Sequence, residues 1–389
     1  MSAAEGKGTP YLFFLASTHF VIHVFTMLLP VLLLPFQEEL GVSLVQLSLL
    51  ASVPRLINVF IYIPAGVVSD RHPSAVLTWS FIVTLLGAIV IPLSHSFVSL
   101  LVGFTLIAVG STLYHPPSLR MASEYDPKKL TLAMGIHNTG SSLGFAAGPL
   151  LLGLMLEGWG WRYSFYVWAA LTAVTAVASH RYTSVNLKGS EAGMDLNVFA
   201  GLRSVLTLSF ILVVAMSTLV ESVFNILVTY VPVYFTKDLG MSYSLTSIIT
   251  GLGPLTGLAG SFFGGFAGDM YGKNRVGLAV IVLMGALILV FPGLGNFWLV
   301  VAVYGLSRLF QAAYMALLNG MLAVNCPKEN RSLGFSFNFV MVSLFGAITT
   351  TLAGWLIESR GTGVIFPMSL VLLVPACVIV ALLWRRARD

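Results

Sequence analysis

Long apolar stretches separated by short polar loops occupy almost the whole chain, and no other feature restricts the fold as strongly. Each stretch has about the 20 residues that a helix needs to cross roughly 30 Å of hydrocarbon. Because lipid offers no hydrogen-bond partner to an open strand edge, such segments have to be helical. The twelve predicted membrane helices span residues 11–36, 43–68, 75–95, 97–121, 130–156, 161–180, 205–235, 243–267, 275–295, 297–323, 332–357 and 363–384.

Charged side chains are too few to build a surface that faces water. They make up 9% of the 389 residues, hydrophobic residues make up 57%, and the mean hydropathy is +0.92. Soluble domains carry about a quarter charged residues. The composition therefore indicates an all-α membrane protein and excludes a soluble globular domain.

Lys and Arg are distributed unevenly between the two sides of this predicted arrangement. Most of the 20 basic residues fall on the side that also holds both termini. Since cytoplasmic loops hold the excess of Lys and Arg, we expect both termini in the cytoplasm and a multi-pass protein of the cytoplasmic (plasma) membrane. The pI of about 9.2 follows from this loop bias and needs no nucleic-acid partner.

The chain also contains an internal repeat. Shifting the sequence by 199 positions places residues 39–43 on 238–242 and residues 66–70 on 265–269, with similar side chains in both pairs. Two parallel halves with a substrate site between them are the architecture of many secondary transporters. The repeat predicts an N-terminal six-helix bundle at 1–180, a cytoplasmic linker at 181–202 and a C-terminal six-helix bundle at 203–389.

The repeated loop carries a recognisable motif. Gly66-x-x-x-Asp70-Arg71 and Gly265-x-x-x-Asp269-x-x-Gly272-Lys273 resemble the loop motif of the major facilitator superfamily, and the resemblance covers the whole chain. It implies twelve transmembrane helices in two pseudo-symmetric six-helix bundles, with this loop latching the halves during alternating access. The first copy departs from the pattern because His72-Pro73 stands where Gly and a basic run are usual.

A role in gating follows from this motif. A carboxylate beside a helix end can accept backbone N–H bonds or pair with Arg120 of the fourth predicted helix. The alternative is a solvated loop charge. The predicted gating residues are Asp70, Arg71, Arg120 and Asp269.

The fifth predicted helix is rich in glycine. Gly135, Gly144, Gly148-Pro149 and Gly153 resemble the motif of the superfamily's antiporter branch, although Leu152 replaces one expected glycine. The alternative is close packing, because glycines four residues apart make a flat stripe for another helix.

Within the superfamily, the chain resembles the fosmidomycin-resistance group of exporters. The residues that carry this resemblance are Ser17-Thr18-His19, Gly110-Ser111-x-x-Tyr114-His115-Pro116 with Arg120-Met121-Ala122, and the run from Gly140 to Leu151. Pro117 stands where that group is expected to have Glu, so a proton role of that carboxylate is not carried over.

Ionisable side chains inside the predicted helices are the candidate functional residues. Each costs at least about 2.5 to 3.5 kcal/mol near the middle of a bilayer. His19 and His23 share one face of the first helix, Arg55 lies in the second, Glu221 in the seventh and Arg308 in the tenth. The resemblance implies that helices 1, 4, 7 and 10 line the central cavity. The predicted substrate-binding residues are His19, His23, Arg55, Asn58, Tyr62, Tyr114, His115, Asn225, Arg308, Gln311 and Tyr314.

The charges of these residues favour an anionic substrate. Arg55 and Arg308 outnumber the single deep carboxylate of Glu221, and guanidinium binds carboxylate or phosphonate through two parallel hydrogen bonds. The alternative is that Glu221 neutralises Arg308.

Proton coupling requires a group that changes charge during the cycle. The predicted coupling residues are Glu221 and His19, and a free histidine titrates near pH 6.5. In the antiport scheme, Glu221 is charged beside an arginine and neutral once substrate binds that arginine. For His19 the alternative is a hydrogen bond between packed helices. His137 and Asn138 are expected to pack or to lie at the cytoplasmic mouth.

The sequence therefore predicts a secondary transporter that moves a small organic anion or amphipathic drug by alternating access, as proton-coupled export. The alternatives are an importer or facilitator of a carboxylate or sugar, and a lipid transporter. We expect no enzyme, cofactor or metal, because Glu221 has no second carboxylate or Cys–His pair, Cys326 and Cys377 are far apart, and no G-x-x-x-x-G-K-[ST] run occurs. The expected partners are a small-molecule substrate, protons and membrane lipids, and the protein is expected to be a monomer.

Overall fold

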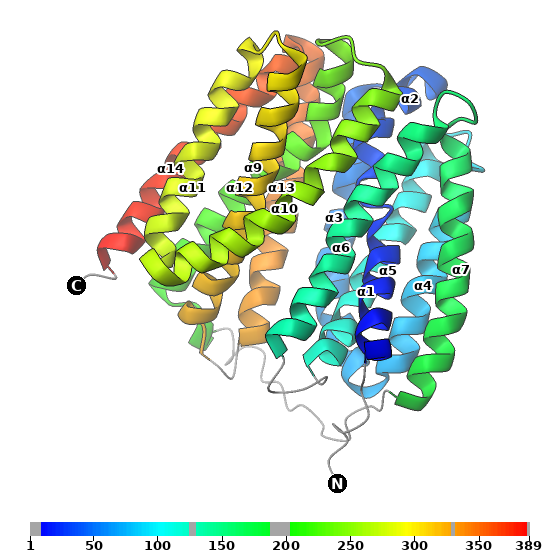
Figure 1. The fold of residues 1–389 in the computed structure, drawn as a ribbon, viewed down its shortest axis with the longest axis horizontal. Coiled ribbons are helices and arrows are strands. Elements are labelled where there is room, and N and C mark those ends of the chain that lie inside the picture. The colour runs from blue at the N-terminus through cyan, green and yellow to red at the C-terminus, as the bar shows by residue number, and fades with distance from the viewer. Residues whose placement is uncertain (1–8, 124–129, 187–202, 328–330, 387–389) are drawn as a thin grey trace. The chain divides into compact units, whose positions relative to one another are not determined.

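Helices make up the regular structure of the described part of the chain. The computed structural model describes residues 9–123, 130–186, 203–327 and 331–386. The helices follow the predicted segments closely (Figure 1), and the all-α fold class is confirmed. They are α1 (Thr9–His23), α2 (Leu28–Leu40), α3 (Leu44–Arg71), α4 (Pro73–Val90), α5 (Phe97–Ser123), α6 (Leu130–Met155), α7 (Trp161–Asn186), α9 (Leu208–Lys237), α10 (Tyr243–Tyr271), α11 (Lys273–Val290), α12 (Phe297–Asn325), α13 (Arg331–Arg360) and α14 (Ile365–Arg386), with short 3₁₀ turns η2 (Phe291–Gly293) and η4 (Thr362–Val364).

Ten spans among the described residues are long and apolar enough to cross a membrane. The first of them, Pro10–Leu40, includes both α1 and α2. The two other predicted spans form α6 and α7, which have 26 residues each and thus also have the length for a crossing. They are less apolar because the run 137–142 of α6 and the last turns of α7, residues 180–186, are mostly polar.

The chain divides into two compact units. The first unit contains Met1–Val42, Leu49–Gly193 and Ser242–Gly251, and the second contains the remaining segments from Ser43 to Asp389. The domain limits predicted at 180 and 203 stay predictions, because residues 187–202 of the predicted linker lie outside the described residues. Its first six residues, 181–186, continue helix α7.

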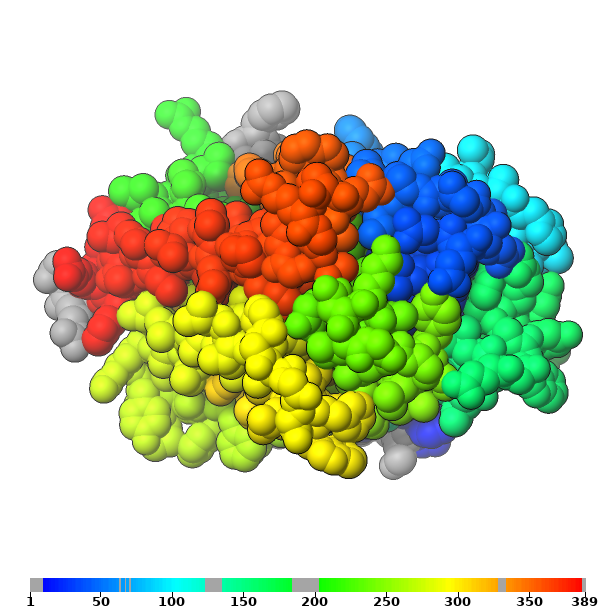
Figure 2. All heavy atoms as spheres, turned by 90° about the horizontal axis from the view of Figure 1, so that it is seen from above, coloured from blue at the N-terminus to red at the C-terminus, as the bar shows by residue number. Residues whose placement is uncertain are grey.

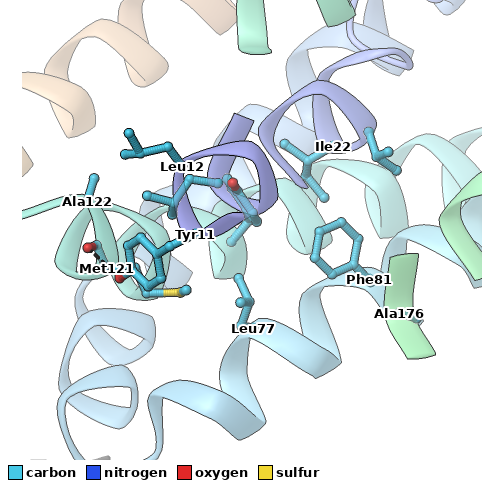
Figure 3. Close-up of a cluster of buried hydrophobic side chains, with 11 residues drawn as sticks. Tyr11, Leu12, Ile22, Leu77, Phe81, Met121, Ala122 and Ala176 are labelled. Atoms are coloured by element: carbon cyan, nitrogen blue, oxygen red, sulfur yellow. Dashed lines mark hydrogen bonds between the residues drawn. The ribbon is translucent and has the colours of Figure 1, made fainter. Parts of the chain in front are cut away.

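Close packing between pairs of helices builds the first unit. Helix α4 packs against α5 and α7, and α1 packs against α6. A cluster of buried side chains joins α1, α4, α5 and α7, among them Leu12, Leu77 and Phe81 (Figure 3). Within this cluster the Tyr11 hydroxyl donates to the Met121 carbonyl at 2.6 Å, which fixes the first turn of α1 to the last turn of α5.

One charged residue connects three elements at the opposite end of this unit. The Arg162 guanidinium pairs with the Glu39 carboxylate and donates to the carbonyls of Pro92 and Ser94 at 3.0 and 3.1 Å. It also lies 4.2 Å from the centre of the Trp161 ring. The ends of α2, α4 and α7 are thereby held together.

The second unit packs α9 against α13 and α14, and α11 against α12 and α14. The view from above shows the red α14 next to the yellow end of α11 (Figure 2). Aromatic rings from four elements meet near this end, with centroids 5.1 to 6.1 Å apart. The rings belong to Tyr234, Phe235, Phe291, Tyr304 and Phe366.

The helix boundaries follow the 199-residue repeat. Helices α3 and α10 begin at Leu44 and Tyr243, which are 199 residues apart, and α4 and α11 begin at Pro73 and Lys273, which are one residue further apart. The junction between α3 and α4 differs in its backbone from the junction between α10 and α11. Gly272 takes φ +90°, which only glycine adopts easily, whereas the first copy starts α4 with Pro73 after His72 at φ −131°.

The first predicted helix differs from its counterpart in being interrupted. Residues 24–27 separate α1 from α2, and tighter bonds from Thr26 N to His23 O at 3.1 Å and from Leu28 N to Phe25 O at 3.2 Å replace the helical pattern. The corresponding α9 runs without a break from Leu208 to Lys237. The single span predicted at 11–36 is present as Pro10–Leu40, but its helix is divided into α1 and α2, which the sequence analysis did not predict.

Candidate functional site

Four histidines gather in the first unit. His19 and His23 come from α1, His115 from α5 and His137 from α6. His19, His23 and His137 are buried, with at most 8% of each side chain exposed, and His115 is partly buried. Three of the four were predicted as substrate-binding residues, and the structure brings these three together.

A chain of hydrogen bonds runs through the cluster. The Thr26 hydroxyl lies 3.2 Å from His23 Nδ1, His23 Nε2 lies 3.1 Å from His19 Nε2, and His19 Nδ1 lies 2.7 Å from the His137 carbonyl oxygen. The last contact fixes one tautomer, because a carbonyl only accepts and His19 Nδ1 therefore carries the proton. The chain begins inside the interruption between α1 and α2, so the irregular backbone takes part in the site.

Ring packing supports the same arrangement. The His19 ring stacks on the His137 ring with centroids 3.8 Å apart and planes 12° apart. Its other neighbours are Tyr114 at 5.4 Å and the edge of His115 at 5.6 Å. Tyr114 is fully buried, and its hydroxyl shares a hydrogen bond of 3.0 Å with Thr18.

The glycine stripe of α6 explains how His137 reaches α1. A Cβ on Gly140, Gly144 or Gly148 would lie 1.9 to 2.4 Å from a carbonyl oxygen of α1 or of the residue that follows it. The two backbones are therefore in contact, and the ring of His137, one turn before Gly140, is placed against His19. We had expected His137 at a packing contact or at the cytoplasmic mouth, and its part in a histidine cluster was missed. Its spacing from the glycine stripe was the available signal.

Other glycines of the fifth-helix motif have different surroundings. A Cβ on Gly153 would lie 2.9 Å from the Ser244 carbonyl, within the first unit, whereas nothing lies within 4 Å of one on Gly135. Gly153 therefore serves close packing, and Gly135 does not.

The three residues of α3 that were predicted to bind substrate lie within two turns of this helix, in the first unit. Arg55 is partly buried, and Asn58 is 8% exposed and one turn further along the same face. The Oδ1 atom of Asn58 is buried without a hydrogen-bond partner in the described structure. Tyr62 is partly exposed at the next turn.

In the second unit, Arg308 and Gln311 of α12 act together. The Arg308 guanidinium donates to Gln311 Oε1, while its Nε atom is buried and has no hydrogen-bond partner in the described structure. In the part of the chain that the structure describes, Arg308 makes no ion pair with Glu221, which was the alternative to an anion site. The Nε–H group of Arg308 is therefore a buried donor without an acceptor in the described structure.

Glu221 of α9 lies near a different residue of α12. It is partly buried, as is Asn225 one turn later. Its carboxylate is close enough to Tyr314 to interact electrostatically with the phenol. Tyr314 is fully buried, with its ring 5.8 Å from that of Phe224.

A small cavity lies within the second unit between α9, α11, α12 and α14. Its volume is about 30 Å³, which is room for about two water molecules. Apolar side chains such as Phe224, Met284 and Phe366 make most of its wall, and Arg308 and Gln311 supply polar groups. A cationic group beside an otherwise apolar wall suits an amphipathic anion.

The predicted gating residues lie at helix ends. Arg71 is the last residue of α3 and is exposed, Arg120 is partly buried in the last turn of α5, and the side chain of Asp70 lies outside the described residues. Asp269 pairs with Lys273 across the junction of α10 and α11 at 3.0 Å, with 76% of the Asp269 side chain exposed.

Comparison with known proteins gives a consistent family assignment. The sequence profile of the Major Facilitator Superfamily matches residues 14–275 and 210–389. The chain is 24% identical over 291 residues to the fosmidomycin resistance protein of Escherichia coli, which covers 72% of this chain and 70% of that protein. It is 24% identical over 359 residues to the hexuronate transporter of Bacillus subtilis, which covers 84% and 83%.

A solved structure supports the fold. The bacterial homologue of the human lysosomal transporter Spinster, in an inward-facing and unoccupied conformation, superposes with a TM-score of 0.79. The superposition covers 97% of this chain and 98% of the other, at 18% sequence identity. At that identity the likeness concerns the fold alone.

Proposed function

The chain belongs to the Major Facilitator Superfamily, and on that premise we propose that it exports a small organic anion or amphipathic drug across the cytoplasmic membrane in exchange for protons. It is a multi-pass membrane transporter of a small-molecule substrate. The relatives reported above are transporters rather than enzymes. The identity of the substrate and the coupling to protons belong to the proposal.

The observation that carries the proposal is the buried Nε–H donor of Arg308, which has no acceptor in the described structure and belongs to a side chain that lines the apolar cavity of the second unit. A buried donor without a partner is rare in native structures and costs roughly 1–3 kcal/mol. A carboxylate or phosphonate would supply the missing acceptor, and the apolar wall would hold the rest of the ligand. Because the cavity holds only about two water molecules, the surrounding side chains have to move apart when a larger substrate binds.

Two relatives support the choice of substrate class and direction. The names of the relatives connect one to resistance against fosmidomycin and the other to transport of a hexuronate, which is a carboxylated sugar. Arg55 of the first unit is a second candidate for anion binding and stays a prediction.

Glu221 is the proposed coupling residue. Among the acidic residues of the sequence, Glu221 alone lies well inside a predicted span. A carboxylate can take up a proton on one side of the membrane and release it on the other. The proposal requires that the protonation state of Glu221 change when the anion binds and again when it leaves.

Inverted membrane vesicles with an acidified interior test the substrate class. We expect them to accumulate a radiolabelled naphthalene carboxylate and not the naphthalene amine of the same ring system. Arg308→Gln should bind the carboxylate about 10- to 100-fold more weakly, because a charge-assisted hydrogen bond contributes roughly 1.5–3 kcal/mol. Arg275→Gln, at an exposed arginine of the same unit, is the matched control. Equal uptake by Arg308→Gln and the control would contradict the anion site.

The same vesicles test the coupling. Glu221→Gln should lose accumulation driven by the proton gradient and keep exchange of labelled for unlabelled anion, because glutamine resembles the neutral carboxyl group but cannot release a proton. Accumulation at the wild-type level by this variant would show that Glu221 does not couple transport to protons.

Import of a carboxylated sugar is the second candidate. The similarity to the hexuronate transporter extends over 84% of the chain and supports it. Right-side-out vesicles with an acidic exterior separate the two, since a proton-coupled importer accumulates glucuronate there and the proposed exporter does not.

A further inference from the structure

We propose that His19, His23 and His115 form a binding site for one transition-metal dication such as Zn²⁺, with an open fourth coordination position. The proposal goes beyond the transport function and concerns the first unit only. Imidazole nitrogens are common ligands of Zn²⁺, Ni²⁺ and Cu²⁺. One ring nitrogen from each of the three histidines lies within 4.8 Å of the other two.

The distance between the first two ligands already suits a metal. Two nitrogens bound to tetrahedral Zn²⁺ at 2.0–2.1 Å are about 3.3 Å apart. His19 Nε2 and His23 Nε2 are 3.1 Å apart. His115 is the least buried of the three, and its ligand nitrogen lies within 4.8 Å of those of His19 and His23.

The tautomers of the two close histidines suit metal binding. His19 Nδ1 donates to the His137 carbonyl, so His19 Nε2 carries a lone pair that points at His23. A metal-binding histidine usually donates its other N–H in this way, often to a backbone carbonyl. The second shell that a metal site needs is therefore present at His19.

His23 can switch between the two states without gaining or losing a proton. Without metal, His23 Nε2–H donates to His19 Nε2, and the Thr26 hydroxyl donates to His23 Nδ1. With metal, the His23 proton resides on Nδ1 and is donated to Thr26 Oγ1, so both Nε2 lone pairs bind the ion. A hydroxyl can donate or accept, so Thr26 satisfies His23 in either state.

The repeat indicates that helix packing does not require these histidines. At the 199-residue offset, His19 and His23 correspond to Thr218 and Ser222 of α9. Each of these donates to a carbonyl of its own helix, Thr218 to Val214 and Ser222 to Thr218. The interruption at 24–27, which supplies Thr26, is likewise absent from α9. In the second unit, the positions that correspond to His19 and His23 are thus occupied by hydroxyl side chains, and the helix packs without histidines there.

Metal binding is measured on the full-length, untagged chain in nanodiscs after treatment with EDTA. With Co²⁺ as the probe we expect one ion per chain and the visible absorption bands of a tetrahedral site. Zn²⁺ should displace Co²⁺ and raise the midpoint of thermal unfolding. X-ray absorption of the Zn²⁺-loaded protein should show imidazole nitrogens at about 2.0–2.1 Å. An oxygen-only coordination shell, or no stoichiometric binding, would overturn the proposal without any substitution.

Substitutions assign the ligands. His23→Gln and His115→Gln should each abolish the tetrahedral Co²⁺ spectrum, and Thr26→Val should weaken binding about tenfold through loss of the second shell. His180→Gln, at an exposed histidine of the same unit, should bind as the wild type does. Binding by His115→Gln at wild-type affinity, or equal loss in His180→Gln, would contradict the assignment. The assay needs no transport, so its outcome is independent of the substrate proposal.

Discussion

At the scale of single residues, Asp269 shows how a functional role can be separated from a structural one. Its carboxylate pairs with Lys273 but most of its side chain is exposed. Exposed ion pairs contribute roughly 0–1 kcal/mol, because water screens the attraction and two long side chains lose freedom. The residue therefore has little to do with the stability of the fold.

Asp269→Asn should leave the midpoint of thermal unfolding within about 1–2 °C of the wild type, since the lost pair is exposed. If the loop motif gates transport, the same variant should slow transport severalfold. Counterflow in proteoliposomes and a thermal unfolding scan give the two measurements. Glu157→Gln removes another exposed carboxylate and serves as the control. Transport by Asp269→Asn at the control rate would remove Asp269 from the gating residues.

The histidine cluster shows which part of a site a sequence reveals. His19 and His23 are four residues apart, so a helix places them on one face and the pair could be predicted. The position of His137 depends on which helix packs against α1 and at what height. That information is contained in the contact of Gly140 with the Ala16 carbonyl, which only the structure shows.

At the scale of the helix, hydrophobic length predicted the elements well because the bilayer sets one length for all of them. The interruption between α1 and α2 has a local signal that the sequence analysis did not use, because Pro30 cannot donate to the Thr26 carbonyl four residues earlier and its ring clashes with that carbonyl. The structure places α6 directly against this segment, where a Cβ on Gly148 would lie 1.9 Å from the Val24 carbonyl. The break therefore coincides with both a proline effect at Thr26 and a close contact between helices at Val24.

Substitution of Gly148 tests this contact. In Gly148→Ala the new Cβ meets backbone, which cannot move aside without separating α1 from α6, so we expect a loss of about 2–4 kcal/mol of stability. Gly135→Ala adds the same methyl group to the same helix, where nothing lies within 4 Å, and should be neutral or slightly stabilising. Thermal unfolding in detergent compares the two. Equal stability of the two variants would mean that α6 does not touch the segment after α1.

At the scale of the whole molecule, the repeat and the distribution of charge predict different things. The 199-residue offset fixes which helices correspond, and the structure confirms that their boundaries repeat. The side on which the loops lie follows from Lys and Arg alone, because each six-helix bundle returns the chain to the side where it began. Orientation in the membrane is therefore a prediction from charge that the fold by itself does not provide.

Single cysteines introduced after replacement of Cys326 and Cys377 by serine test that orientation. Ser96→Cys and Gly295→Cys lie in exposed loops, between α4 and α5 and between α11 and α12, and should react with a membrane-impermeant maleimide on intact cells. Arg203→Cys lies exposed before α9 and should react only after the membrane is permeabilised, because the excess of basic residues holds its loop in the cytoplasm. A mass shift on gels reports each reaction. Labelling of Arg203→Cys in intact cells, with protection of Ser96→Cys, would reverse the topology and place both termini outside, and the direction of the proposed transport would reverse with it.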